Sequence, residues 1–321
     1  MDLPDSKEKP GDSAETLSVP VVDLDVIVNG DAEQRSQAIQ HLGCACEEWG
    51  LFMVINHGVP ESLQGATVDA CKEMFNLPAE ENTEYMGVAP TAPIILGTTT
   101  TISAYCRRNY IKLLTHPNIH CPEKPPNLRG NVTEYTTRTR GLMLELTTAI
   151  SESLGLDGGR IAEALNLDHC FHIYTWNQYP PADPEAGEIG LPPHSDHGLL
   201  SVLSQNGVDG LQLEKNGRWL PAKPIPNSLF VVVGDQLEIV SNGRYKAALH
   251  RAVIHGELER MSSVSMIGPC LDVVVQPIPE LAPQGMEDFR CMKYREYIEC
   301  KYRGIPKPER ECGVAHPSGA E

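Results

Sequence analysis

Short strand-like segments fill the second half of the chain. From residue 171 to about residue 275, alternating or uniformly apolar runs are separated by Gly, Pro and Asn turns. Short runs of this kind between turn signals predict β-strands rather than helices. We expect strands at 171–179, 198–204, 210–213, 219–221, 229–233, 237–241, 245–253, 262–267 and 272–275. Many short strands at this spacing predict a sandwich or barrel of antiparallel strands.

The first half of the chain has a helical period instead. Apolar residues recur at helical spacing over 31–48, 60–75, 129–154 and 161–165, and short strands are expected at 19–24 and 51–55. Residues 87–101 contain Pro90, Pro93, Gly97 and four consecutive threonines, so we expect an irregular loop there.

These patterns predict one compact unit with four parts. Residues 1–17 are polar and are expected to be a disordered tail. A helix-rich region at 18–165 packs on a β core at 166–305, which ends in a helix at 292–302. Residues 306–321 form a loose tail.

Composition and charge limit the partners. The 26 basic and 43 acidic residues give a formal net charge of −17, which argues against nucleic acid, because phosphate binding needs a basic surface. No apolar run is long enough to span a bilayer, and the N-terminus lacks the apolar core of a secretory signal. The ten cysteines include no Cys-x-x-Cys pair, so we expect free thiols. We therefore expect a cytoplasmic protein, and favour a monomer because no heptad or repeat is visible.

A candidate metal site begins with His194 and Asp196, two residues apart. In an extended strand, such positions point to the same face. His250 lies about fifty residues later in a strand-like run that follows an Asn-Gly turn signal. A single His-x-Asp pair is more often a surface dipeptide, and a single strand histidine is more often a core residue. Together, however, two imidazoles and a carboxylate on one face make the ligand set of non-haem iron(II) oxygenases, which leaves three metal positions open.

Ten residues after His250 come Arg260 and Ser262, again with a spacing of two. A guanidinium group could hold a carboxylate through two parallel hydrogen bonds, and the serine hydroxyl could add a third. The order of the five groups along the chain carries more information than any one of them.

This order resembles the plant-type 2-oxoglutarate- and iron(II)-dependent dioxygenases, of the isopenicillin N synthase-like superfamily. Further matching motifs are VPVVDL at 19–24, WGLFMVINHGV at 49–59, NQYPP at 177–181, DGLQ at 209–212, GDQLE at 234–238 and SNGRY at 241–245. The resemblance covers about residues 18 to 305. It implies a mainly β fold, with a double-stranded β-helix (jelly roll) core packed against a helical N-terminal portion.

The resemblance also implies the cofactors. His194, Asp196 and His250 would bind Fe(II), which 2-oxoglutarate would chelate. The far carboxylate of 2-oxoglutarate would reach Arg260 and Ser262. Asn177 and Tyr179 match positions that also hydrogen-bond this co-substrate.

The implied reaction consumes O2 and 2-oxoglutarate, with ascorbate as reductant, releases succinate and CO2, and oxidises a carbon of the main substrate. No general base is needed, so we assign no catalytic acid or base, and we interpret Asp235 as a turn residue.

The main substrate is expected to be a small, largely apolar plant specialised metabolite, because pockets of this kind are mostly apolar with a few polar anchors. Residues near the site by family position are Thr175, Met266 and Gly268. The loop at 90–110 and the C-terminal helix could add Tyr105, Tyr294 and Tyr297. A core role is an equally good interpretation of each. The chain departs from the family's usual text at Arg107-Arg108, where a tryptophan-containing motif is frequent.

Three alternatives stay open. An ascorbate-dependent, ethylene-forming-type oxidase has the same fold and an Arg-x-Ser pair, but produces no succinate. A non-catalytic small-molecule receptor could keep the fold, although it has no need of all five groups. A zinc hydrolase is disfavoured, because no activating glutamate stands beside the histidines.

Overall fold

The computed structural model describes residues 18–86, 88, 92–100, 107–181, 189–282 and 287–308. The expected N-terminal tail, most of the expected C-terminal tail and Tyr105 lie outside these ranges. Among the helices of the described ranges, none has both the length and the apolar character needed to cross a membrane. All the described cysteines are free thiols, as expected.

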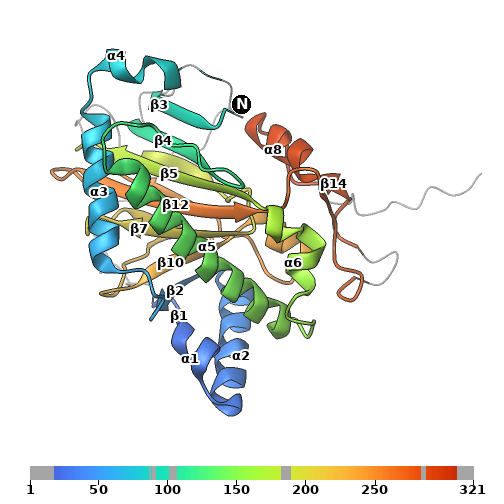
Figure 1. Ribbon diagram of the computed structural model, residues 1–321. Helices are drawn as coiled ribbons and strands as arrows, with labels where there is room; N and C mark the ends of the chain where they lie inside the picture. The colour runs from blue at the N-terminus through green and yellow to red at the C-terminus, as the bar shows by residue number, and fades with distance from the viewer. Residues whose placement is uncertain are drawn as a thin grey trace, which may run out of the picture.

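An eight-stranded sheet forms the centre of the molecule (Figure 1). All its neighbouring strands are antiparallel except β1 and β2, which are parallel. The strand order is β1 (Val21–Asp23), β2 (Leu51–Ile55), β10 (Leu229–Val233), β7 (Leu200–Gln205), β12 (Arg260–Gly268), β5 (Phe171–Tyr179), β4 (Arg107–His116) and β3 (Ile94–Thr100).

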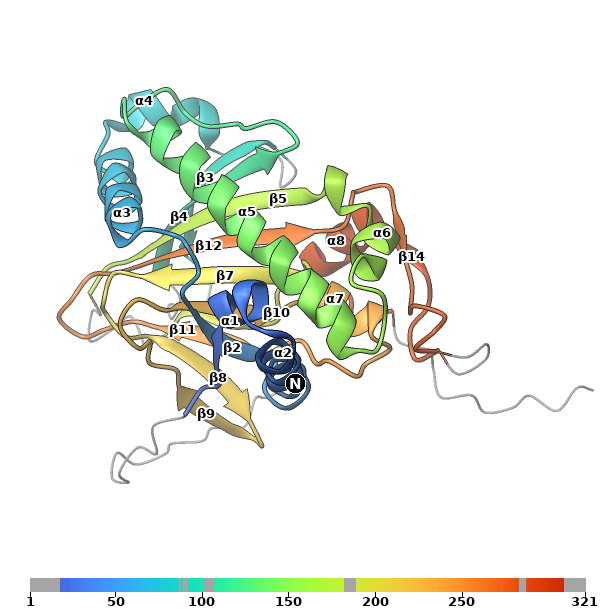
Figure 2. The same ribbon diagram turned by 60° about the horizontal axis from the view of Figure 1, so that its bottom comes forward.

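A second sheet of four strands faces the first on the side away from the long helix (Figure 2). Its order is β6 (Ile189–His194), β11 (His250–Val253), β8 (Leu211–Lys215) and β9 (Arg218–Pro221). Leu203 and Phe230 of the large sheet pack with Leu211 and Leu213 of the small sheet in one buried cluster. The two sheets are the jelly-roll core that the family resemblance implied. A separate short pair joins β13 (Val274–Val275) and β14 (Met292–Lys293).

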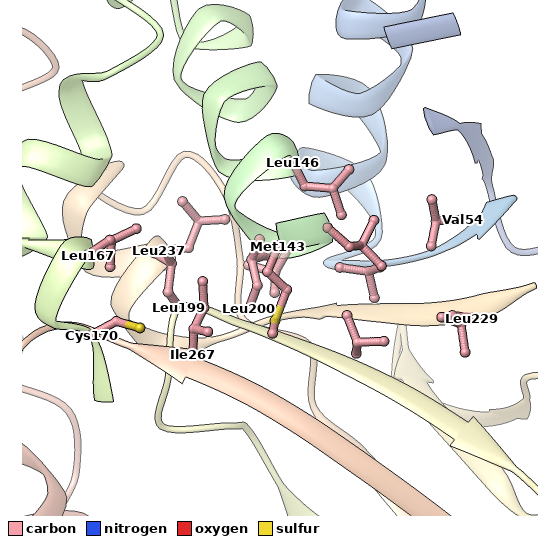
Figure 3. Close-up of a cluster of buried hydrophobic side chains, with 14 of the residues drawn as sticks. Val54, Met143, Leu146, Leu167, Cys170, Leu199, Leu200, Leu229, Leu237 and Ile267 are labelled. Atoms are coloured by element: carbon pink, nitrogen blue, oxygen red, sulfur yellow. The ribbon is translucent and has the colours of Figure 1, made fainter. Parts of the chain in front are cut away.

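Helices cover the outer face of the large sheet. The longest, α5 (Leu128–Ser153), runs diagonally across the strands (Figure 2). Its Met143 and Leu146 are fully buried above Leu200 and Ile267 (Figure 3). The other helices are α1 (Leu24–Asn29), α2 (Ala32–Glu48), α3 (Glu61–Phe75), α4 (Ala79–Asn82), α6 (Arg160–Leu165), α7 (Asp235–Val240) and α8 (Tyr294–Tyr302), with 3₁₀ turns η1 (Thr83–Tyr85) and η2 (Leu167–His169). The apolar face of α5 therefore closes the outer core, and the space between the two sheets is left for a site.

Two expectations about secondary structure are wrong. The irregular loop expected at 87–101 contains β3, which pairs with β4 from Ile94 to Thr100. Isoleucine and threonine favour strands. Pro93 precedes β3, and the absence of a side chain at Gly97 makes room for the Tyr110 ring of β4, which a Cβ atom would approach to 2.7 Å. The strand expected at 237–241 is helix α7, whose six residues are all buried. Periodicity cannot distinguish a buried strand from a buried helix when both faces are covered.

Several other strands differ from the expected bounds, and the strand expected at 272–275 covers only Val274–Val275. The strand expected at 19–24 ends at Asp23, whose carboxylate accepts a 3.0 Å hydrogen bond from the Asp25 N–H and so caps α1. The run expected at 245–253 forms a strand only from His250 onward. Strands β2, β5 and β10 have the expected bounds.

Candidate active site

Three side chains converge at the end of the small sheet where β6 ends and β11 begins. His194 is the last residue of β6 and pairs with His250, the first residue of β11, and Asp196 lies two residues beyond the end of β6. Asp196 Oδ1 lies 3.7 Å from His194 Nε2 and 3.9 Å from His250 Nε2. One ligand atom from each residue lies within 4.8 Å of the other two, and within the described ranges no other three His, Cys, Asp or Glu residues are grouped in this way.

Hydrogen bonds fix the tautomers of both histidines. His194 Nδ1 lies 2.8 Å from the Pro192 carbonyl oxygen, and His250 Nδ1 lies 3.0 Å from the Ala248 carbonyl oxygen. A carbonyl oxygen only accepts, so each Nδ1 carries the proton and donates it. The Nε2 lone pairs, which face Asp196, are then free for a metal ion.

The charge states also suit a divalent metal. Burial and the neighbouring His250 lower the pKa of His194 to about 4, with a smaller contribution from the Arg108 charge, so the ring is neutral at pH 7. Burial raises the pKa of the Asp196 carboxyl, but His250 and His194 outweigh it, and the net pKa lies below its usual value. Neutral imidazoles and an ionised carboxylate are the forms that bind metal.

Helix α7 holds the chain that carries Asp196. The backbone N–H of Asp235 donates a 2.8 Å hydrogen bond to the Asp196 carbonyl oxygen, and Gln236 Nε2 donates one of 3.1 Å to the His197 carbonyl oxygen. The buried N-terminal end of α7 therefore holds Asp196 and His197, two consecutive residues of the segment between β6 and β7 (residues 195–199, the metal loop).

A narrow cavity of about 40 Å³ leads from the three converging side chains into the space between the sheets. It is lined by His194, Asp196 and His250, by apolar residues that include Leu203 and Val232, and by the four residues expected to bind 2-oxoglutarate, Asn177, Tyr179, Arg260 and Ser262. The structure thus brings all seven of these predicted site residues into one cavity.

Arg260 is a buried cation without a counter-ion. Its side chain is 1% exposed, and the ion pairs among the described residues do not include it. Its Nη2 donates a 3.1 Å hydrogen bond to Gln205 Oε1, but Nε and Nη1 are buried without a partner. Burial lowers its pKa, which the Tyr179 hydroxyl opposes. Since an unpaired buried charge costs several kcal/mol, this arrangement fits an anionic ligand that accepts two hydrogen bonds.

The backbone makes room for this guanidinium group at Gly210. A Cβ atom on Gly210 would lie 2.6 Å from Arg260 Cδ and Nε and 2.7 Å from the Val253 carbonyl oxygen. Any side chain at this position would therefore displace Arg260 or the strand backbone.

The remaining co-substrate candidates lie on two paired strands. In the β12–β5 register, Arg260 is opposite Tyr179 and Ser262 is opposite Asn177. Asn177 Nδ2 lies 3.4 Å from Ser262 Oγ, and Asn177 Oδ1 accepts a 2.9 Å hydrogen bond from Arg108 Nη1. All four face the same cavity. From the sequence, Arg108 was noted only as part of a departure from the family's usual sequence and was not assigned to the site.

The six residues expected near the main substrate are more scattered. Gly268 ends β12, and Tyr294 is fully buried with its hydroxyl 2.9 Å from His197 Nδ1; neither lines the cavity described above. Thr175 and Met266 lie on β5 and β12 but do not line the cavity described above. Tyr297 is buried, and its hydroxyl donates a 2.7 Å hydrogen bond to Asp235 Oδ2. Tyr105 lies outside the described residues.

Asp235 is not a simple turn residue, contrary to the interpretation from sequence. Its side chain is fully buried at the start of α7. Its oxygens lie 2.6 Å from Lys301 Nζ and 3.0 Å from Lys307 Nζ. Burial raises the pKa of Asp235, but the two lysines outweigh it and keep the net pKa below its usual value. This network joins the C-terminal segment to the metal loop.

Comparison with known proteins gives consistent matches along nearly the whole chain. Residues 19–127 match the family model described as non-haem dioxygenase in morphine synthesis N-terminal, and residues 167–269 match the 2OG-Fe(II) oxygenase superfamily. The 2-oxoglutarate-dependent dioxygenase 19 of Oryza sativa subsp. japonica is 58% identical over 294 residues, which are 90% of this chain and 87% of that protein. The flavonol synthase/flavanone 3-hydroxylase of Petunia hybrida is 32% identical over 91% of this chain and 85% of its own length. A crystal structure of JOX2 in complex with 2OG, Fe and JA has a TM-score of 0.80 at 28% identity and covers 96% of this chain and 91% of that one.

Proposed function

The chain belongs to the plant 2-oxoglutarate- and iron(II)-dependent dioxygenases, and within that family we propose that it hydroxylates a small, largely apolar plant metabolite. It is an oxidoreductase that uses iron and 2-oxoglutarate. The proposal concerns the substrate class, the type of oxidation and the role of each residue.

We assign the iron to His194, Asp196 and His250. Their three ligand atoms face one another, both imidazoles are held as the tautomer with a free Nε2, and the carboxylate is ionised. Two imidazoles and one carboxylate suit iron(II) and leave positions for co-substrate and oxygen. When bound, the iron supplies the oxygen chemistry that couples decarboxylation of 2-oxoglutarate to oxidation of the substrate.

The observation that carries the proposal is Arg260. A fully buried guanidinium group with two unpartnered nitrogens faces the cavity that the metal ligands close. A dicarboxylate such as 2-oxoglutarate would supply the missing charge at Arg260 with one end and reach the metal with the other. Ser262 and Tyr179 would donate to the same far carboxylate, and Asn177 Nδ2 would donate to the co-substrate nearer the metal.

The chain's part in the reaction is then to position the substrate and the co-substrate and to exclude water. The apolar wall, which includes Leu203 and Val232, keeps the inner cavity dry. The proposed metal site is more open near His194, whose side chain is 30% exposed, than near His250, whose side chain is 6% exposed. We place the main substrate on the His194 side. A relative is named for action on flavonoids, which agrees with a small, mainly apolar substrate.

Succinate formation tests this function. Purified protein with iron(II), ascorbate, 2-oxoglutarate and air is incubated with pools of plant metabolites. Succinate that rises with one pool supports the proposal and starts the identification of the substrate. An ethylene-forming-type oxidase would turn over without succinate, and a receptor would bind a metabolite without consuming 2-oxoglutarate.

A further inference from the structure

We propose that the main substrate carries a carboxylate and that Arg108 of β4 binds it. This inference rests on the proposed function, because it concerns the substrate of the same site. The proposed binding of iron and 2-oxoglutarate uses one arginine, Arg260, so the role of Arg108 needs its own explanation.

Strand β4 directs Arg108 toward the site. Ile111 and Leu113 of β4 are buried in the outer core under the helices. Residues of the opposite parity, Arg108 and Tyr110, therefore face the other side of the sheet. Arg108 does not line the inner cavity itself, but it is hydrogen-bonded to Asn177, which does, and β4 contacts β6, the strand that ends at His194.

The guanidinium group of Arg108 is held firmly but incompletely. Its Nη1 donates a 2.9 Å hydrogen bond to Asn177 Oδ1, and its central carbon lies 4.6 Å from the centre of the Tyr110 ring. Its Nε is buried without a hydrogen-bond partner, and none of the ion pairs among the described residues includes Arg108. An arginine has five N–H donors in a planar fork. The guanidinium group of Arg108 is therefore held in place, but it still has an N–H donor without a partner and has no counter-ion.

The two arginines flank Asn177 from opposite sides. Arg260 is fully buried at the inner end of the cavity, and Arg108 is only half-buried. The Asn177 amide turns its Oδ1 to Arg108 and its Nδ2 to Ser262, which belongs with Arg260. A molecule of 2-oxoglutarate between Arg260 and the metal would use the inner arginine. The outer arginine would then need a different anion, and a carboxylate accepts two parallel hydrogen bonds from such a fork.

Matched pairs of an acid and its neutral derivative provide the test. The probes are indole-3-acetate with indole-3-acetamide, jasmonate with methyl jasmonate, and cinnamate with cinnamamide. Each is titrated by calorimetry into protein loaded with iron(II) and 2-oxoglutarate without oxygen. We expect the acid of at least one pair to bind about 10- to 100-fold more tightly than its neutral partner, as for a charged hydrogen bond.

Variants of Arg108 assign this preference to one residue. Arg108→Gln should bind acid and neutral probe equally, and Arg108→Lys should keep part of the preference because it keeps the charge. Arg138→Gln, which removes an exposed arginine paired with Glu134 on α5, should keep all of it. Affinity for 2-oxoglutarate should be unchanged in all three variants.

Two results would overturn the inference. One is equal binding of acid and neutral probe by the wild-type protein in every pair. The other is an Arg108→Gln variant that loses 2-oxoglutarate affinity to the same extent as an Asn177→Ala variant measured beside it, which would make Arg108 a positioning residue for Asn177. Failure of the proposed function gives a different result, since the wild-type protein would then not bind 2-oxoglutarate before any probe is added.

Discussion

Lys301 of the C-terminal helix donates a 2.8 Å hydrogen bond from Nζ to Ser195 Oγ. Ser195 stands between His194 and Asp196, the two proposed metal ligands of the same loop. The same ammonium group lies 2.6 Å from Asp235 Oδ2, and the Asp235 N–H binds the Asp196 carbonyl oxygen. The C-terminal helix is therefore connected to the metal loop both directly and through α7.

Replacing this lysine should weaken iron binding. Lys301→Met removes the bond to Ser195 and one of the two lysines that pair with Asp235. Loss of an outer partner of metal ligands typically lowers metal affinity by about 10- to 100-fold, and we expect that range for iron(II) measured by competition with a chelator. Lys124→Met, which removes an exposed lysine paired with Glu81, is the control. Equal iron affinity in the two variants would show that the C-terminal helix does not support the metal loop.

Replacing Arg260 should act on the co-substrate alone. Arg260→Gln removes the charge that we assign to the far carboxylate of 2-oxoglutarate and does not touch the metal ligands. Hydrogen bonds to charged groups contribute about 1.5–3 kcal/mol each, so the Kd of 2-oxoglutarate should rise by at least about tenfold. Iron content by metal analysis should stay at the wild-type value. A variant that binds 2-oxoglutarate normally would exclude Arg260 from the co-substrate site.

His172 of β5 should make the fold sensitive to acid. It is fully buried, with Nε2 2.8 Å from Ser265 Oγ, and burial, followed by the charges of Arg140 and His116, lowers its pKa to about 3. In the unfolded chain its pKa is about 6.5. The unfolded state therefore binds the proton first as the pH falls, and the stability contributed by His172 is complete above pH 6.5 and is lost progressively down to about pH 3.

The size of this effect is measurable by urea unfolding between pH 7.5 and 4.5. A shift of this size corresponds to about 5 kcal/mol over its full range. His172→Gln cannot titrate, so its free energy of unfolding should fall less steeply with decreasing pH than that of the wild-type protein. Identical slopes would mean that His172 is accessible to protons in the folded state.

The sequence predicted the chemistry of the site better than its surroundings. Six of the seven residues that meet in one cavity stand in pairs with short local spacings, His-x-Asp, Arg-x-Ser and Asn-x-Tyr, and a pleated strand places two residues at this spacing on one face. The seventh, His250, is distant in sequence and was linked to them by the order of the groups along the chain. Asp196 does not even lie on the strand, but the turn after β6 still brings its carboxylate to the two imidazoles.

The features that the sequence did not reveal depend on distant contacts. Asp235 resembled a turn residue because its partner Lys301 is 66 residues away. Helix α7 resembled a strand because six residues are too few to show a helical period, and Leu237, Glu238 and Ile239 alternate in polarity as in a strand. Strand β3 resembled a loop because Gly97, which makes room for the Tyr110 ring of β4, interrupts it, and its pairing with β4 is not visible in its own residues.

The most direct test of the account is the iron content and the succinate formation of His250→Ala beside the wild-type protein. The wild-type protein should bind one iron(II) and convert 2-oxoglutarate to succinate, slowly alone and faster with its substrate. His250→Ala should lose both properties together, because a carboxylate and one imidazole no longer hold the metal against water. A His250→Ala protein that keeps its iron and forms succinate at the wild-type rate would contradict the assignment of His194, Asp196 and His250 as the metal centre.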